Sequence, residues 1–187
     1  MNIKASDIRR GMVVTMDGNN FIVVDFAHRT PGNLRAFVQA KLKNMTSGST
    51  IEKRLRSDEQ LEVPYVERKE FEYLYSTGDE HVFMDTETFD QLPFGNDMVG
   101  DSMGYLLPNS RVQVTYIDDK AVSVEVPASV DLLITDTPPA IKGATATNQY
   151  KEATTETGLK VQVPPFIEAG ERVRIDTRSG DYVERVK

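Results

Sequence analysis

The sequence predicts an all-β fold made of three small barrels, and three observations carry that prediction. Apolar and polar residues alternate with a period of two, which is typical of strands that bury one face. Turn residues such as Asp17-Gly18 and Ser179-Gly180 separate short runs of this kind at regular spacing. No long amphipathic helical pattern occurs in the 187 residues, a length that allows up to three small domains.

The alternating runs place the strands in chain order. They predict strands over residues 37–43, 112–116, 122–126, 159–163, 172–176 and 181–186. In the second run, Val112, Val114 and Tyr116 are expected to share one face. Short helical turns are expected at residues 6–10, 86–91 and 96–100. The last two strands are expected to pair through the turn at residues 177–180.

Two natural boundaries divide the chain into residues 1–64, 65–127 and 128–187. The first follows a polar stretch and falls at Val63-Pro64, and the second falls where the strand ending at Val126 meets Pro127. The formal net charge of −7 is unevenly shared between these parts. The first part has 10 Lys and Arg against 7 Asp and Glu (+3), the second has 4 against 13 (−9), and the third has 8 against 9 (−1). The acidity therefore belongs to the middle part, and the first part is free to meet RNA.

Composition excludes several classes of protein. The chain has no Cys, which rules out disulfides, thiolate nucleophiles and iron–sulfur clusters. Its two histidines, His28 and His81, have no partners at ligand spacing and are expected to be surface or strand residues. No phosphate loop, HExxH or GxSxG motif occurs, so we expect no enzyme, no metal and no cofactor. Without an apolar run of membrane length or a signal peptide, we expect a cytoplasmic protein with no membrane partner.

The first part carries a basic hairpin. Arg29 and Arg35 flank Thr30, Pro31, Gly32, Asn33 and Leu34, and the Pro-Gly-Asn sequence is typical of a tight turn. Lys41 and Lys43 alternate with apolar residues on the following strand, and Lys53, Arg54 and Arg56 lie further along. This arrangement suits contact with an RNA backbone, and an ordinary solvated hairpin fits the pattern equally well.

The last part carries a second, weaker signal. The turn after residues 172–176 consists of Thr177, Arg178, Ser179 and Gly180, with Tyr182 and Arg185 nearby. An arginine beside hydroxyl groups on a tight turn can hold phosphates or sugars. Arginines are common in turns, so this segment alone does not identify a ligand.

A run of spaced residues near the C-terminus resembles the signature of bacterial elongation factor P, a translation factor. The run consists of Lys151, Ala153, Gly158, Val161, Val163, Pro164, Ile167 and Gly170, and every fixed position of that signature is filled. Residues 176–187, 10–12, 31–32 with 36–37, and 82–85 also resemble the family. The resemblance therefore extends over essentially the whole chain.

The resemblance implies an architecture and a function. The family has an N-terminal SH3-like, KOW-type barrel followed by two OB-fold barrels, in an L-shaped arrangement like that of tRNA. The resemblance implies that the protein binds the ribosome, contacting both subunits, between the peptidyl-tRNA and exit sites. There it would position the acceptor end of the peptidyl-tRNA and relieve stalling at consecutive prolines, without covalent chemistry of its own. The implied partners are peptidyl-tRNA, rRNA, exit-site mRNA and a basic ribosomal protein, and the implied state is a monomer.

The resemblance also assigns the sites. The hairpin tip, with Arg29, Pro31, Gly32, Asn33, Leu34 and Arg35, would face the peptidyl-transferase centre. Lys41, Lys43, Thr177, Arg178, Ser179, Gly180, Tyr182 and Arg185 would contact rRNA or tRNA backbone. A loop with Gly143, Ala144 and Thr145 would lie near the exit-site mRNA.

Two positions depart from the family. Asn33 stands where many members carry a modified Lys or Arg, so either the tip works unmodified or a shifted loop presents Arg29 or Arg35. Ala144 stands where many relatives have Asp, as in the elongation factor P-like paralogue, whereas residues 178–182 look like the main factor. A specialised paralogue and a generic RNA-binding module of OB and KOW type are the alternatives.

Overall fold

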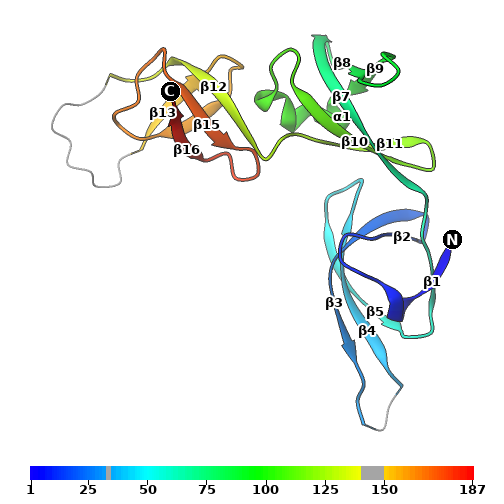
Figure 1. The fold of residues 1–187 in the computed structure, drawn as a ribbon. Helices are drawn as coiled ribbons and strands as arrows, with labels where there is room; N and C mark the ends of the chain where they lie inside the picture. The colour runs from blue at the N-terminus through cyan, green and yellow to red at the C-terminus, as the bar shows by residue number, and fades with distance from the viewer. Residues whose placement is uncertain (33–34, 140–149) are drawn as a thin grey trace. The chain divides into compact units, whose positions relative to one another are not determined.

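The computed structural model describes residues 1–32, 35–139 and 150–187. Asn33, Leu34, Gly143, Ala144 and Thr145, which carry sequence-based predictions, lie outside these residues. The described residues are mostly strands, arranged in three curled sheets that can be followed in Figure 1. This confirms the predicted all-β class. The chain divides into two compact units, residues 1–69 with 114–123 and residues 70–113 with 124–187.

The first sheet has the strand order β1-β6-β2-β3-β4-β5. Its strands are β1 (Asn2–Lys4), β2 (Val13–Met16), β3 (Asn19–Arg29), β4 (Phe37–Asn44), β5 (Thr50–Arg56) and β6 (Gln60–Glu62), with the short 3-10 turn η1 (Ala5–Asp7) after β1. Val38, Ala40 and Leu42 on β4 are at most 1% exposed and join the core beneath the sheet. The intervening residues of β4 face solvent. The predicted alternation over residues 37–43 is therefore confirmed, and it sets which face of β4 can meet a partner.

The second sheet has the order β11-β10-β7-β8-β9 and an aromatic core. Its strands are β7 (Val66–Thr77), β8 (Glu80–Asp85), β9 (Gln91–Gly95), β10 (Arg111–Ile117) and β11 (Lys120–Glu125), with α1 (Asn96–Val99) and the 3-10 segment η2 (Gly100–Tyr105) between β9 and β10. Phe71 and Phe94 meet edge to face at 5.9 Å, and Phe83 lies 5.4 Å from Phe94. Such ring pairs stabilise a small core beyond the area they bury.

One expectation for this part is wrong. Tyr116 is only half-buried, whereas Thr115 and Ile117 are 2% and 3% exposed, so the alternation of β10 changes parity after Val114. The change coincides with the point where the strand passes from one compact unit to the other. The short helical turn expected at residues 86–91 is present as a single turn that is not continued: the Phe89 N–H donates to the Asp85 carbonyl at 2.9 Å. The Asp85 carboxylate accepts the N–H groups of Glu87 and Thr88, as a residue at a helix N-cap does.

The third sheet has the order β14-β13-β12-β15-β16. Its strands are β12 (Ser129–Asp136), β13 (Lys151–Thr155), β14 (Lys160–Val163), β15 (Arg172–Asp176) and β16 (Tyr182–Val186). Leu132, Ile134, Val173 and Ile175 are fully buried in its core. The predicted pairing of the last two strands is confirmed, with Arg174 opposite Glu184.

The domain limits at residues 64 and 127 fall between strands. β6 ends at Glu62 and β7 begins at Val66, and β11 ends at Glu125 before β12 begins at Ser129. The limits remain a prediction, because the two compact units divide the chain at other points. Among the helices of the described residues, none has the length and apolar character needed to cross a membrane.

Candidate nucleic-acid interface

The long hairpin of β3 and β4 positions the first group of predicted residues. Its register runs from Phe21 opposite Asn44 to Arg29 opposite Phe37, interrupted by a bulge between Val23 and Asp25. Figure 1 shows the hairpin extending beyond the other strands of its sheet. Arg35 is exposed near the end of the hairpin, as are Thr30 and Gly32. Thr30, Gly32 and Arg35 thus leave their polar groups open to a partner.

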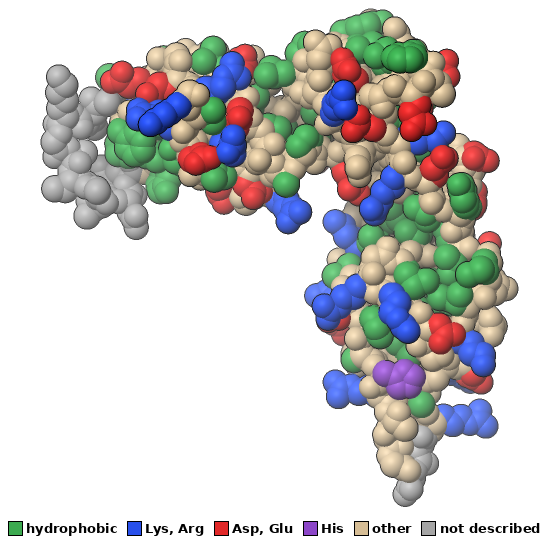
Figure 2. Space-filling view, in the orientation of Figure 1, with side chains coloured by type: hydrophobic (Ala, Val, Ile, Leu, Met, Phe, Trp, Pro, Cys, Tyr) green, Lys and Arg blue, Asp and Glu red, His purple; other side chains and the backbone are tan. Residues whose placement is uncertain are grey.

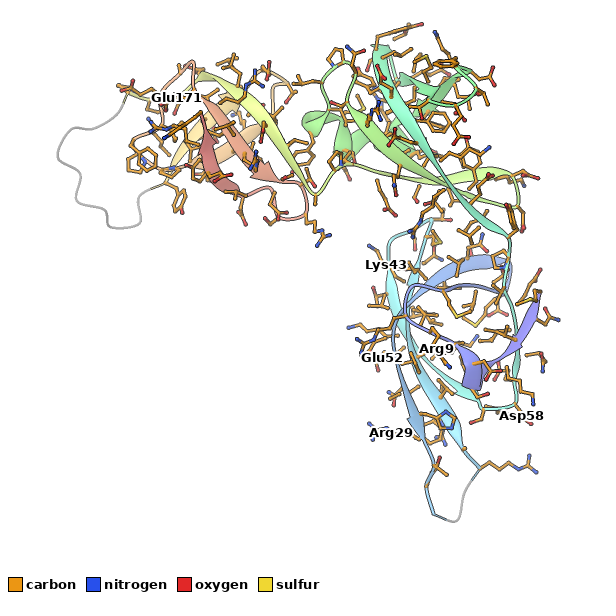
Figure 3. The ribbon with its side chains drawn as sticks, viewed as in Figure 1. Arg9, Arg29, Lys43, Glu52, Asp58 and Glu171 are labelled. Carbon is orange, nitrogen blue, oxygen red and sulfur yellow. The ribbon has the colours of Figure 1, made fainter. Side chains whose placement is uncertain are left out.

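The cations of this hairpin form no salt bridge with a carboxylate among the described residues. Arg29, Arg35, Lys41 and Lys43 make no ion pair in that part of the chain, although Lys41 lies opposite Asp25 and Glu52 in the register. Figure 3 shows Arg29 near the end of β3 and Lys43 towards the other end of β4. Unpaired cations spread along an exposed strand pair are suited to phosphates.

Other charged residues of this part of the chain are paired. Arg10 donates to Asp25 with nitrogen-to-oxygen distances of 2.5 and 2.9 Å, and Lys53 lies 3.4 Å from Asp17. The hydrogen bonds from Arg10 hold the pKa of the Asp25 carboxyl below its usual value. Figure 2 shows Lys and Arg side chains spread over the visible face of this part of the chain.

Arg54 and Arg56 lie beside the hairpin, which their position in the sequence did not reveal. Arg54 stacks over the Phe37 ring, with its guanidinium carbon 3.7 Å from the ring centroid. A hollow of about 510 Å³ opens beside this stack, lined by Arg35, Ala36, Phe37, Arg54, Leu55, Arg56 and Asp58. Only the register of β4 against β5 brings these residues together, and that register is not visible in the chain order.

The turn between β15 and β16 positions the second predicted group. The Asp176 carboxylate accepts the N–H groups of Arg178 at 2.8 Å and Ser179 at 3.3 Å. Gly180 completes the turn with a φ of +77°, and its N–H donates to the Asp176 carbonyl. These bonds fix the backbone that presents Arg178 and Ser179, which are both exposed.

The remaining residues of this group are engaged within the protein. The Thr177 hydroxyl donates to the Pro127 carbonyl at 2.6 Å, and an Arg185 guanidinium nitrogen lies 2.9 Å from a Glu171 oxygen. Tyr182 packs against the core of its sheet, and burial raises the pKa of its phenol. Arg185 is exposed as well but is held in its ion pair with Glu171, so Arg178 and Ser179 are the exposed side chains of the predicted set that present themselves on the turn. No sequence pattern distinguished Arg185, on a strand, from Arg178, on a turn.

The two histidines occupy different environments. His28 is exposed on β3, whereas His81 is 7% exposed on β8. The His81 ring nitrogens lie 2.6 Å from the Ser76 hydroxyl and 2.7 Å from the Asn96 side-chain oxygen. This network satisfies a buried ring. Residues 1–32, 35–139 and 150–187 contain no cluster of three His, Asp or Glu that could hold a metal ion.

Three family descriptions match successive parts of the chain. The elongation factor P KOW-like domain matches residues 4–61, the elongation factor P OB domain matches residues 66–124, and the elongation factor P C-terminal domain matches residues 130–185.

Curated relatives named elongation factor P match over nearly the full length. The relative from Acidobacterium capsulatum is 45% identical over 185 residues, covering 99% of this chain and 100% of the relative. The relative from a Thermoanaerobacter species is 46% identical over 184 residues, covering 98% of this chain and 100% of the relative.

Solved structures support the fold. A structure described as eukaryotic translation initiation factor 5A from Methanococcus jannaschii aligns with a TM-score of 0.54 at 21% identity, covering 66% of this chain and 95% of that one. A protein of the same family from Naegleria fowleri aligns with a TM-score of 0.51 at 14% identity, covering 67% of this chain and 98% of that one.

Proposed function

Because the chain belongs to the elongation factor P family of translation factors, we propose that it binds the ribosome between the peptidyl-tRNA and exit sites. There it promotes peptide-bond formation and relieves stalling at consecutive prolines. The observation that carries the proposal is the exposed hairpin of β3 and β4, whose cations form no salt bridge among the described residues. The chain is also about 45% identical to its relatives over nearly its full length.

The hairpin supports a positioning mechanism. Arg29 and Arg35 flank its end, and Lys41 and Lys43 follow along the exposed face of β4. Contacts from these cations to phosphates would hold the acceptor end of the peptidyl-tRNA against the hairpin. Limiting misaligned states of a slow proline substrate lowers the entropic part of the barrier, and orientation can account for several kcal/mol, of order 7 in favourable cases. The step needs no reacting side chain from the protein.

The other parts of the chain take different partners in this proposal. The turn bearing Arg178 and Ser179 contacts rRNA or tRNA backbone. The middle part, with a net charge of −9, repels RNA and suits a basic ribosomal protein. The loop with Ala144 lies near the exit-site mRNA, and the loss of a carboxylate there weakens its hydrogen bonding to bases.

A translation reporter tests the function. Deleting the gene should slow translation through a Pro-Pro-Pro reporter and leave an Ala-Ala-Ala reporter unchanged. Complementation with Arg35→Ala should restore less rescue than complementation with Lys120→Ala, which removes an exposed cation from β11. Equal rates on the two reporters after deletion would contradict the function. Equal rescue by the two variants would contradict the placement of the hairpin.

Sedimentation separates this proposal from a generic RNA-binding module. The protein should co-sediment with ribosomes stalled on proline codons, and excess free RNA should not displace it. Displacement by free RNA at equal concentration would favour the generic module.

The intact mass of the protein from its native host tests the tip. We propose that Asn33 acts unmodified, which requires a mass equal to that of the sequence. An added group on Arg29 or Arg35 would instead assign the functional cation to that residue.

A further inference from the structure

A cationic hollow lies on the first sheet, beside the hairpin rather than at its tip. The hollow measures about 510 Å³, which lies within the range of small-ligand sites. Arg35, Arg54 and Arg56 contribute three guanidinium groups to its lining, and Asp58 contributes one carboxylate. We call it the arginine hollow.

The floor of the arginine hollow contains an aromatic ring that is already stacked. Phe37 on β4 pairs with Arg56 on β5, and Gln39 pairs with Arg54, so these side chains stand on the exposed face of the two strands. The Arg54 guanidinium lies over the Phe37 ring at 3.7 Å. A guanidinium already held over a ring loses little further freedom when a second planar group stacks on it.

The charges of the arginine hollow are unsatisfied. None of its three arginines forms an ion pair with a carboxylate in residues 1–32, 35–139 and 150–187, and Asp58 forms none with them. The pairs Arg10 with Asp25 and Lys53 with Asp17 show that the same sheet pairs its cations elsewhere. Three unpaired guanidiniums beside one carboxylate give the hollow a local excess of positive charge.

We propose that the arginine hollow binds a nucleotide of single-stranded RNA, a proposal that rests on the proposed function and adds a contact distinct from the hairpin tip. A base stacks on the Arg54–Phe37 pair, and flanking phosphates receive N–H donors from Arg35 and Arg56. Asp58 accepts a hydrogen bond from a ribose hydroxyl, which deoxyribose lacks at its 2′ position. The same carboxylate disfavours a free inorganic anion. A base within a duplex is stacked on both faces and cannot enter.

Fluorescence anisotropy with a labelled single-stranded RNA hexanucleotide at 50 mM salt tests the site in the full chain. Arg54→Ala should raise the Kd by about fivefold or more, because both a stack and a charge are lost. Arg54→Lys should raise it less, since the charge remains. Lys53→Ala is the control: it removes one cation adjacent to Arg54 on the same strand, and the Lys53 ammonium pairs with Asp17. The Kd of this variant should stay within twofold of wild type. A Kd within twofold of wild type for both Arg54→Ala and Arg56→Ala would overturn the proposal, as would equal weakening by Lys53→Ala.

Salt and competitor identity sharpen the test. Arg56→Ala should reduce the slope of log Kd against log salt by about 0.7, the value for one lost phosphate contact on a single strand. DNA of the same sequence and an RNA duplex should bind more weakly, and Asp58→Ala should narrow the difference between RNA and DNA. Displacement of the RNA by equimolar inorganic phosphate would overturn the nucleotide assignment in favour of a simple anion site.

The binding assay and the reporter assay can refute the arginine hollow and the proposed function separately. Unchanged RNA binding by the Arg54 and Arg56 variants, with proline rescue still dependent on the gene, refutes the arginine hollow alone. Loss of binding in these variants, with no effect of gene deletion on the Pro-Pro-Pro reporter, supports the hollow and refutes the proposed function.

Discussion

Arginine has different surroundings in the first and third sheets. In the third sheet, Arg174 donates to Asp131 at 2.8 Å and to Glu184 at 2.6 Å. In the first sheet, the guanidinium groups of Arg54 and Arg56 have no carboxylate partner within the described part of the chain. The two sheets therefore use the same side chain in one case to join strands and in the other to leave a charge available.

The cross-strand neighbours explain the difference. Arg174 lies opposite Asp131 on β12 and opposite Glu184 on β16, and opposite charges at such positions stabilise a sheet. Arg54 and Arg56 lie opposite Gln39 and Phe37, which cannot neutralise them. For these three arginines, the cross-strand neighbour thus separates a structural cation from cations available for binding.

The largest effect is expected from reversing the charge at Arg174. Arg174→Glu would place a third carboxylate beside Asp131 and Glu184, replacing attraction with repulsion. We expect the opening free energy of the third sheet to fall by about 2–3 kcal/mol. Amide hydrogen exchange at the buried strand residues Ile134 and Ile175 measures it. Arg35→Glu is the control, because Arg35 lies in an exposed segment and forms no ion pair among the described residues. If Arg35→Glu reduced the exchange protection of the first sheet by as much, the distinction between the two sheets would be lost.

A smaller effect is expected at the turn that presents Arg178. Gly180 has a φ of +77°, and a Cβ added there would lie 3.3 Å from the Tyr105 hydroxyl oxygen. Gly180→Ala should cost about 1–2 kcal/mol, because the backbone conformation disfavours a side chain and the contact is tight. Hydrogen exchange at Ile175 and at Val173 reports the loss. Arg178→Ala should change protection by less than about 0.5 kcal/mol, which would show that the third sheet also contains an arginine with no structural role.

The pH dependence of the third sheet should follow Asp131. Hydrogen bonds from Arg174 lower the pKa of this carboxyl below its ordinary value of 3.8. The stability that this contributes is present above pH 3.8 and is lost as the pH falls from there through the lower folded-state pKa. The loss should be about 1 kcal/mol or less, because both side chains are about a third exposed to solvent. Amide hydrogen exchange, corrected for the pH dependence of its intrinsic rate, should show this loss of stability. The loss should be smaller in Asp131→Asn and as large as in the wild type in Asp136→Asn. The same dependence of stability on pH in the wild type and both variants would contradict the assignment to Asp131.

The sequence predicted strands well where a single face of the strand packs on the same core along the whole strand. Val38, Ala40 and Leu42 follow the period of two because β4 covers a single core along its length. Thr115 and Ile117 break the period where β10 runs from one compact unit into the other, and no local sequence pattern indicates that change.

The candidate site was predictable only in part, for the same reason. Exposed cations of the hairpin and of the Arg178 turn follow from local turn chemistry and alternation. The stack of Arg54 on Phe37 and the ion pair of Arg185 with Glu171 depend on partners 17 and 14 residues away in the chain. Such partners are fixed by strand register, which a single sequence does not specify.

The smallest effect on stability is expected where the proposed binding effect is large. Arg54→Ala removes an exposed guanidinium that lies over the half-buried Phe37 ring and forms no ion pair among the described residues. We expect the protection of Val38 and Leu42, whose amides lie in β4, to fall by less than about 0.5–1 kcal/mol, the usual worth of an exposed cation–π contact. The same variant should weaken binding of single-stranded RNA by about fivefold or more. A loss of 2 kcal/mol or more in β4 would instead make Arg54 a structural cation like Arg174, and register would then no longer distinguish the two sheets.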